Sequence, residues 1–291
     1  MDKLLVVGAS GLIGSTALQL GKVQFDAYGT YNKNVAGGTL HLDVTERPKV
    51  FETIRSVKPD FVIDAHGVHL DYCETHQEEA WRLNVEGSRN VAEASREIGA
   101  KYLFLSSEYV FDGEKRAYKE SDAPRPINYY GKTKWAAEST LKVLDIDHII
   151  VRTSGVYGTA SSTGMVSFVP WVIGNLEKGE NTNVISDKYI SPTFVDDLCG
   201  MIFDLYKNDA AGIFHVVGKD CITRYKFAKL ISKEFGLNPR LIKPIKASEL
   251  KLAAERPRKV RMRTEKLIGI THKQTLGVEE GLKLIHERLG A

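Results

Sequence analysis

Short apolar runs alternate with segments of helical periodicity through the first two-thirds of this chain. The runs that we expect to be strands are Leu4–Val7, Ala27–Tyr31, Phe61–Ala65, Tyr102–Ser106 and Ile149–Arg152. The helix candidates between them lie near Leu12–Leu20, Val50–Val57, Glu79–Ile98 and Lys132–Leu144. Strands of a parallel sheet are buried on both faces and therefore read as continuous apolar runs. The alternation predicts βαβ units and an α/β fold with a doubly wound parallel sheet, whose ligands bind beyond the carboxyl ends of its strands.

A glycine-rich loop follows the first predicted strand directly and opens the first predicted helix. It reads Gly8-Ala9-Ser10-Gly11-Leu12-Ile13-Gly14, and this position between a strand and a helix makes such a motif informative. Glycines permit a tight turn and a close approach of the backbone to a pyrophosphate, which then lies at the positive end of the helix dipole. We therefore predict a Rossmann-type dinucleotide site at Gly8, Ser10, Gly11, Leu12, Ile13 and Gly14. The alternative is a strand-to-helix turn that merely uses glycine.

The end of the second predicted strand distinguishes between the two nicotinamide cofactors. NAD-preferring proteins carry an acidic residue about 20 residues after the loop, where it binds the ribose 2′-hydroxyl. This chain has Tyr31, Asn32 and Lys33 there and no carboxylate, and an amide and an ammonium suit a 2′-phosphate. NADP(H) is therefore predicted in preference to NAD(H), and a solvated loop lysine is the alternative role of Lys33. Asp43 and Val44, which end a short predicted strand at Thr39–Leu42, are expected to contact the adenine.

Tyr130 and Lys134 are four residues apart on a predicted helix, so their side chains lie on the same face. A tyrosine with a pKa near 10 is a weak acid–base catalyst at neutral pH, and a neighbouring ammonium is expected to lower that pKa. The phenol then exchanges a proton with a carbinol oxygen while a nicotinamide exchanges the hydride. Ser106 and Ser107 end a predicted strand, where a hydroxyl is expected to hold a substrate carbonyl opposite the phenol. A surface pair on a helix is the common alternative for an isolated Tyr-x-x-x-Lys.

These motifs taken together resemble the extended short-chain dehydrogenase/reductases, which combine a glycine loop, a hydroxyl residue such as Ser107 and a Tyr130-x-x-x-Lys134 pair. Within that group, the stretch Ser106-Ser107-Glu108-Tyr109-Val110-Phe111-Asp112-Gly113 is similar to one typical of dTDP-4-dehydrorhamnose reductases. Further matching pieces extend the resemblance over nearly the whole chain: Asp71-Tyr72-Cys73-Glu74, Tyr118-Lys119-Glu120, Pro126 before Tyr129-Tyr130-Gly131, Ser191-Pro192-Thr193, Asp196-Asp197-Leu198 and Arg256-Pro257-Arg258.

The resemblance implies an oxidoreductase of dTDP-rhamnose biosynthesis that reduces a 4-keto-6-deoxy sugar nucleotide with NADPH. It implies that Ser107 is the hydroxyl member of the catalytic triad, that Tyr130 donates the proton, and that Lys134 tunes Tyr130 and holds the nicotinamide ribose. The further cofactor positions that it implies are Ala65, His66, Gly67 and Ser106. The substrate positions are Val68, Ser107, Glu108, Tyr109 and Arg256. We expect no metal site, because His66 and His69 have no further ligand cluster around them.

The chain departs from the reductase pattern after the Ile149–Arg152 strand. Gly155 stands where the pattern places an aromatic residue, which removes an indole that contacts the sugar, and 161–165 replaces an asparagine-rich segment. Two other functions therefore stay open. One is epimerisation or reduction of another keto sugar nucleotide. The other is a non-catalytic NADP-binding regulatory subunit, because the β subunit of methionine adenosyltransferase also resembles this family.

The alternating pattern loosens after about Thr153. We expect residues 1–154 to form the NADP(H)-binding domain, residues 155–291 to form mainly a smaller substrate-binding lobe, and residues 187–219 to return to the first domain. Later elements are a strand at Ile213–Val217 and helices at Phe227–Phe235 and Val278–Leu289. The densest basic stretch contains Arg256, Arg258, Lys259, Arg261 and Arg263. We expect a nucleotide diphosphate to bind one or two of these, and a solvated surface is the alternative for the rest.

Composition excludes several classes of partner. A formal net charge of +3 over 291 residues gives no reason to expect nucleic acid, and no apolar run approaches the roughly 18 to 20 residues that span a bilayer. Three cysteines without paired spacing indicate neither a zinc site nor a disulfide framework. We therefore expect a cytoplasmic enzyme without a signal peptide whose partner is a small nucleotide sugar. Homodimerisation, common for this fold, stays an open alternative.

Overall fold

A seven-stranded parallel sheet forms the centre of the computed structural model, which describes residues 1–35, 39–159 and 167–290. The strand order is β11-β6-β5-β4-β1-β2-β3. The strands are β1 (Lys3–Val7), β2 (Asp26–Tyr31), β3 (Leu40–His41), β4 (Phe61–Asp64), β5 (Lys101–Ser107), β6 (His148–Thr153) and β11 (Gly212–His215). Every ladder in this sheet is parallel. The predicted doubly wound α/β fold is therefore confirmed.

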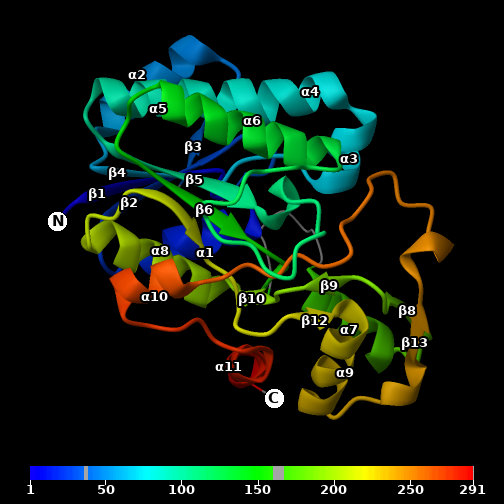
Figure 1. Cartoon of the computed structure of the whole chain (residues 1–291). Coiled ribbons are helices and arrows are strands. Elements are labelled where there is room, and N and C mark those ends of the chain that lie inside the picture. Colours follow the sequence, from blue (N-terminus) through cyan, green and yellow to red (C-terminus); the bar gives the residue numbers. More distant parts are fainter. Residues whose placement is uncertain (36–38, 160–166, 291) are drawn as a thin grey trace.

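Helices cover both faces of the sheet (Figure 1). One face packs against α1 (Leu12–Gly21) and α8 (Val195–Lys207), and the other packs against α2 (Arg47–Val57), α5 (Ser88–Glu97) and α6 (Tyr129–Val143). Successive residues of a strand point to opposite faces. Leu4 and Val6 of β1 accordingly lie in the first core, whereas Leu5 and Val7 lie in the second. This two-sided burial explains why the strands are uninterrupted apolar runs in the sequence.

The direction of winding reverses at β1, which fixes where a ligand can bind. The chain passes from β1 to β2 and β3 on one side and to β4, β5 and β6 on the other. In open α/β sheets a crevice forms at this point beyond the carboxyl ends of the strands. The loops that follow β1 and β4 flank the crevice, so the glycine loop and residues 65–67 lie on either side of it.

The long helix expected at Glu79–Ile98 contains an irregular turn. The structure has α4 (Gln77–Trp81), a π-helical turn at Arg82–Gly87, and then α5. A short helix that was not predicted, α3 (Leu70–Thr75), precedes them. Such π-turns insert an extra residue into a helix and often occur at functional sites.

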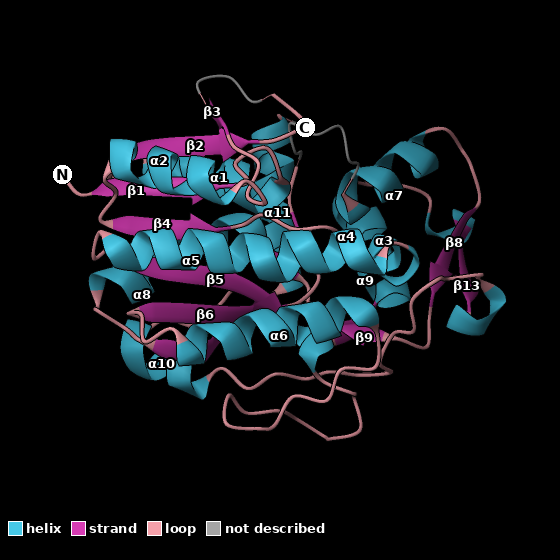
Figure 2. Ribbon diagram, turned by 90° about the horizontal axis from the view of Figure 1, so that it is seen from above, coloured by secondary structure: helices cyan, strands magenta, loops and turns pink. Residues whose placement is uncertain are grey.

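Most of the remaining chain builds small sheets and helices beside the carboxyl edge of the large sheet. These elements are β7 (Val156–Tyr157), α7 (Phe168–Glu177), β8 (Thr182–Ile185), β9 (Tyr189–Ile190), β10 (Thr193–Phe194), β12 (Ile222–Thr223), α9 (Arg224–Glu234), β13 (Ile242–Ile245) and α11 (Val278–Leu289). Helix α10 (Glu265–Thr271) instead packs against α8 and β11 of the large sheet. Figure 2 shows α7, α9, β8 and β13 gathered at this end of the molecule. Tyr157, Phe194, Phe227 and Leu282 belong to their separate core. The assignment of this part to the substrate stays a prediction.

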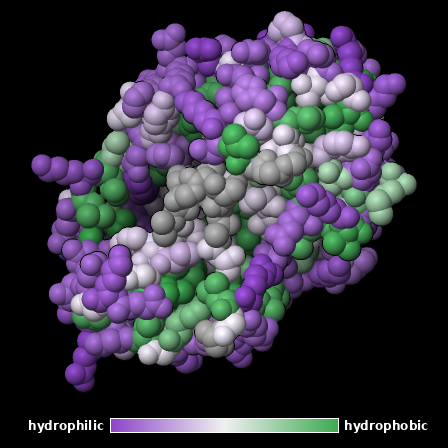
Figure 3. All heavy atoms as spheres, turned by 180° about the vertical axis from the view of Figure 1, so that it is seen from behind, coloured by the Kyte–Doolittle hydropathy of each residue, from purple (hydrophilic) through white to green (hydrophobic). Residues whose placement is uncertain are grey.

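Hydrophilic side chains cover much of the face seen in Figure 3, with smaller hydrophobic groups between them. Within the described residues, no helix combines the length and apolar character that a membrane span requires.

Candidate active site

The glycine loop holds a backbone conformation that side chains would disrupt. Gly8 has a φ of +83°, in the left-handed region. A Cβ at Gly14 would lie 2.2 Å from the carbonyl oxygen of Gly8, so the helix and the loop approach closely only without a side chain there. Helix α1 follows with Gly11 at its N-cap, no side-chain cap and no acidic residue in its first turn. The first N–H groups of α1 therefore suit an anion, as a dinucleotide pyrophosphate requires.

A cleft of about 520 Å³ opens beside this loop. Its size is that of a typical cofactor or ligand site. Many of the predicted cofactor positions line it: Gly8, Ser10, Gly11, Tyr31, Asn32, Lys33, Asp43, Val44, Ala65, His66 and Gly67, together with Val68 from the predicted substrate set. The predicted positions Leu12, Ile13, Gly14, Ser106, Tyr130 and Lys134 are not part of its lining. The cleft thus brings together residues that follow β1, β2, β3 and β4.

Two cations stand where the sequence predicts the 2′-phosphate. Lys33 is 81% exposed, and its ammonium is 4.0 Å from the Glu79 carboxylate. Arg82, at the start of the π-turn, also lines the cleft and was not predicted, because in the sequence it reads as a solvated helix residue. Burial favours the neutral form of Asp43, but hydrogen bonds from Thr45 and Asn32 and the charge of Arg82 outweigh it and lower the pKa of Asp43. Asn32 is therefore held by Asp43.

A buried polar cluster underlies the loop after β4. The carboxylate of Asp64 contacts Nδ1 of His66 and accepts a hydrogen bond of 2.5 Å from the Tyr102 hydroxyl. The other ring nitrogen of His66 is 2.9 Å from the Leu83 carbonyl oxygen. Burial raises the pKa of Asp64, but His66, Tyr102 and the nearby Lys134 charge lower it further than burial raises it. Both ring nitrogens of His66 have partners, and within the described chain no three His, Cys, Asp or Glu side chains form a metal cluster.

The three predicted catalytic side chains meet next to the cleft. Ser107 ends β5, while Tyr130 and Lys134 lie one turn apart on α6, whose N-cap Asn128 accepts a 2.8 Å bond from the Gly131 N–H. The Ser107 hydroxyl is near enough to the Tyr130 phenol to influence its pKa. The Lys134 ammonium lies 5.9 Å from the centre of the Tyr130 ring and donates a 3.0 Å bond to the Leu105 carbonyl. It also faces Gly67, where an added Cβ would lie 3.5 Å away.

The pKa of Tyr130 does not show the net lowering that the sequence predicts from Lys134. The pKa of Tyr130 is raised from 10, first by burial and then by the charge of the neighbouring Cys73, with the Ser107 hydrogen bond opposing them. Lys134 is itself buried, which lowers its pKa, and its ammonium is directed to the Leu105 carbonyl. The phenol is therefore protonated at neutral pH, which is the form that an acid catalyst needs.

The predicted substrate side contains a carboxyl group without a full set of partners. Glu108 is 4% exposed, and its Oε2 has no hydrogen-bond partner in the described structure. Burial raises the pKa of Glu108 to about 7, and a hydrogen bond with Ser154 and the charge of Arg224 oppose that rise. The Tyr109 ring meets Tyr130 edge-to-face with centroids 5.9 Å apart. Burial and the Glu108 charge raise the pKa of Tyr109 to about 12.

Two predicted contact residues have their polar groups engaged elsewhere. The Ser106 hydroxyl donates a 2.5 Å bond to Glu138 inside the core. Arg256 binds both carboxylate oxygens of Asp71, which ties the predicted basic stretch to α3. Burial raises the pKa of Asp71, but hydrogen bonds from Arg256 and the Ala254 N–H hold it below its usual value.

Comparison with known proteins establishes the family. A model of the RmlD substrate binding domain matches residues 2–290. The chain belongs to the RmlD substrate binding domain family. The dTDP-4-dehydrorhamnose reductase of Aggregatibacter actinomycetemcomitans is 30% identical to it over 270 residues, 88% of this chain and 89% of the relative. The methionine adenosyltransferase 2 subunit beta of Bos taurus is 27% identical over 295 residues, 96% of this chain and 87% of that protein.

A solved structure of a dTDP-4-dehydrorhamnose reductase is similar to this chain over nearly its whole length. The crystal structure of the dTDP-4-dehydrorhamnose reductase from Bacillus anthracis, in complex with NADP, has a TM-score of 0.91 and 30% identity, with 99% of each chain covered. The predicted resemblance to dTDP-4-dehydrorhamnose reductases is thereby confirmed.

Gly155 of this RmlD-family chain has a left-handed backbone conformation. Its φ is +52°, and an added Cβ would lie 3.2 Å from Ile190 Cδ1 and 3.5 Å from Pro192 Cα. A side chain at this position would therefore be strained and would point at these neighbours. The departure predicted at 161–165 lies outside the described residues.

Besides Arg82, the fold brings two further polar residues to the site that were not predicted, Asn84 and Arg224. Asn84 of the π-turn accepts a 3.1 Å bond from the Val68 N–H and donates a 3.0 Å bond to the Thr133 hydroxyl, so it ties the loop after β4 to α6. The sequence does contain an indication of Asn84, because it lies on the apolar side of a predicted helix, where an amide without a hydrogen-bond partner would be costly. Arg224 begins α9 near Glu108. The sequence gives no indication that Arg224 belongs to the site, because its neighbours in space are distant in the sequence.

Proposed function

We propose that this protein is an NADPH-dependent reductase of a 4-keto-6-deoxy sugar nucleotide, as dTDP-4-dehydrorhamnose reductases are. The observation that carries the proposal is the meeting of Ser107, Tyr130 and Lys134 beside a cleft built on a glycine loop. Family membership, a relative named as a reductase of this kind, and a structural neighbour titled as an NADP complex support it.

The residues around the cleft suit NADP(H). The glycine loop and the first turn of α1 would hold the pyrophosphate, and the two cations Lys33 and Arg82 would meet the 2′-phosphate. Lys134, which faces Gly67, would hold the nicotinamide ribose. The nicotinamide supplies the hydride when it is bound.

Tyr130 completes the reduction with a proton. A ketone that accepts a hydride at carbon develops negative charge on oxygen, and the phenol proton of Tyr130 converts that oxygen to the new hydroxyl. The Ser107 hydroxyl, which lies near the Tyr130 phenol, would orient the carbonyl oxygen toward that phenol. Lys134 stabilises the phenolate that remains, because its ammonium is close to the ring.

The substrate pocket would recognise the sugar through Glu108 and Tyr109. The buried carboxyl of Glu108 has an oxygen without a partner, which a sugar hydroxyl would satisfy. Arg224 brings a positive charge near Glu108 and would attract the diphosphate. Because Gly155 replaces the expected aromatic residue, we propose that the sugar packs against Tyr109 instead of an indole.

The regulatory-subunit alternative rests on the match to the methionine adenosyltransferase 2 subunit beta over 96% of the chain. Epimerisation, or reduction of another keto sugar nucleotide, would use the same three catalytic side chains. Enzyme assays with defined variants separate these functions.

The test measures NADPH oxidation with a panel of keto sugar nucleotides. The Tyr130→Phe variant should lose about 10²-fold or more in kcat, the usual contribution of a general acid, and should still bind NADPH. Tyr129→Phe is the matched control, since it removes the neighbouring phenol and should turn over normally. Retained turnover in Tyr130→Phe would reject the catalytic role. Tight NADPH binding without turnover of any ketone would favour the regulatory subunit, and product with an inverted carbon but no NADPH consumed would favour an epimerase.

A further inference from the structure

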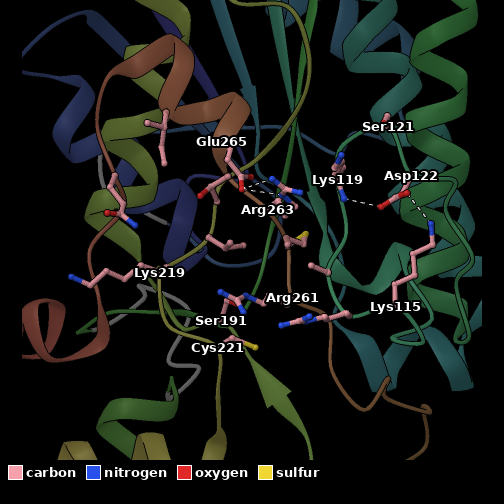
Figure 4. Close-up of a pocket in the computed structure, with 18 residues that line it drawn as sticks. Lys115, Lys119, Ser121, Asp122, Ser191, Lys219, Cys221, Arg261, Arg263 and Glu265 are labelled. Atoms are coloured by element: carbon pink, nitrogen blue, oxygen red, sulfur yellow. Dashed lines mark hydrogen bonds and ion pairs between the residues drawn. The ribbon is translucent and has the colours of Figure 1, made fainter.

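A second cavity lies apart from the cofactor cleft, and cations outnumber carboxylates in its lining (Figure 4). Its volume is about 830 Å³, and it shares no lining residue with the cleft. Three chain segments form most of its wall: 115–122 after β5, 217–221 after β11, and 261–274, which includes α10. Six cationic side chains line it: Lys115, Arg116, Lys119, Lys219, Arg261 and Arg263.

The carboxylates of the cavity balance only part of this charge. Two of them line the wall: Asp122 pairs with Lys115 at 2.8 Å, and Glu265 pairs with Arg263 at 2.8 Å. Lys219 pairs with a carboxylate outside the lining, Glu280, at 2.7 Å. The lining therefore carries an excess of four positive charges, which exceeds the +3 of the whole chain.

Three cations of the cavity have no carboxylate within ion-pair distance in the described part of the chain: Arg116, Lys119 and Arg261. Arg116 and Lys119 come from the segment after β5 and Arg261 from the segment before α10, so the fold brings them together over a large sequence separation. Like charges in one cavity repel one another, and a bound anion would relieve that repulsion. A concave wall of one sign also concentrates anions from solution.

The lining indicates which kind of anion fits. Hydroxyl groups of Ser121, Ser191 and Thr264 add neutral donors to the cations, a combination that suits phosphate oxygens. No aromatic side chain is among the lining residues, so nothing there would stack on a nucleotide base. We propose that this cavity binds a small phosphorylated metabolite without an aromatic base, such as a sugar phosphate or a pyrophosphate, at a site separate from the cofactor and substrate pockets.

The proposed anion site adjoins the wall of the substrate pocket. Ser191 lines the cavity, and its N–H donates a 3.1 Å bond to the Ser154 hydroxyl. Ser154 in turn hydrogen-bonds Glu108. Because Ser154 connects Ser191 of the cavity to Glu108, a competition with dTDP is needed to separate this anion site from the diphosphate position of the proposed substrate.

The test is calorimetric titration of the whole chain with inorganic pyrophosphate at low salt. The Arg116→Gln/Arg261→Gln variant should bind pyrophosphate about a hundredfold more weakly, because each of the two lost charge-assisted bonds contributes about tenfold in affinity. The matched control is Lys22→Gln/Lys58→Gln, which removes two exposed cations at the ends of α1 and α2 and should leave the affinity within about twofold of the wild type. NADPH binding verifies that each variant is folded.

Three outcomes overturn the proposal. Unchanged pyrophosphate affinity in the Arg116→Gln/Arg261→Gln variant would show that these cations do not form the site. Displacement of pyrophosphate by dTDP, in a competitive manner, would place the anion in the substrate pocket. Tighter binding of a short single-stranded oligonucleotide through the same two arginines would assign the cavity to nucleic acid. Failure of the proposed reductase activity would leave all three readouts unaffected, since none of them measures turnover.

Discussion

Glu138 and Arg152 form an ion pair inside the core, and its removal should be costly. Both side chains are 1% exposed, with Arg152 Nε at 2.9 Å from Oε1 and Nη2 at 2.6 Å from Oε2. The Ser106 hydroxyl donates a third bond to Glu138. The Glu138→Leu variant would strand a buried guanidinium whose Nη1 already has no partner. We expect a loss of about 3–5 kcal/mol in the free energy of unfolding.

The double variant Glu138→Leu/Arg152→Met separates the pair energy from simple packing. Replacing both charges with apolar groups removes the desolvation cost along with the attraction, and such replacements are often neutral. The double variant should therefore be more stable than Glu138→Leu alone. Equilibrium urea unfolding, followed by the fluorescence of the three tryptophans, measures each free energy. A loss below about 1 kcal/mol in Glu138→Leu, or a double variant that loses the sum of both single losses, would refute the reasoning.

Three further predictions concern the cleft and the pocket. Gly14→Ala should weaken NADPH binding strongly, because its Cβ would meet the Gly8 carbonyl oxygen at 2.2 Å. The control Gly200→Ala has open space in α8 and should stabilise the fold by up to ~1 kcal/mol. Equal NADPH affinity in the two variants would contradict this prediction. Arg82→Gln should raise the Kd for NADPH about tenfold and leave the Kd for NADH unchanged, as measured by titration. An equal rise in the two Kd values would argue against recognition of the 2′-phosphate by Arg82. The pKa of Glu108 is raised from 4.5 to about 7, so the folded state binds its proton more tightly than the unfolded state, and this contribution to stability is lost as the pH rises through 7. Glu108→Gln should therefore gain stability relative to the wild type between pH 5 and pH 8 in urea unfolding, and a constant difference would exclude a titrating Glu108.

Local patterns predicted the elements that hold the cofactor because their causes are local. The run Leu4–Val7, the glycine loop and the following helix each depend on neighbours in sequence, and the structure places β1 at Lys3–Val7 and α1 at Leu12–Gly21. The convergence of Ser107 with Tyr130 followed from topology, because β5 ends at the edge of the sheet where α6 begins.

The parts that could not be predicted depend on contacts between distant residues. The pairing of Glu138 with Arg152 requires β6 to lie against α6, and a polar residue in either element reads as solvated in the sequence. The pKa of Tyr130 is raised mainly by burial under several segments of the chain. The Tyr-x-x-x-Lys spacing in the sequence indicates the neighbouring lysine but not this burial. The π-turn that interrupts the helix expected at Glu79–Ile98 is bonded to residues outside the helix. His66 contacts the Leu83 carbonyl oxygen, and the Val68 N–H of the loop after β4 donates to Asn84.

The π-turn at Arg82–Gly87 makes the length of this helix as important as its composition. Deleting one residue from the turn would rotate everything on one side of it by about 100° around the helix axis. Such a deletion would carry Arg82 away from the cleft or Asn84 away from Val68 and Thr133, although every remaining side chain would be unchanged. Substitution scans would not detect this constraint, and a chain shortened by one residue in this turn should fold but lose the alignment of the loop after β4 with α6.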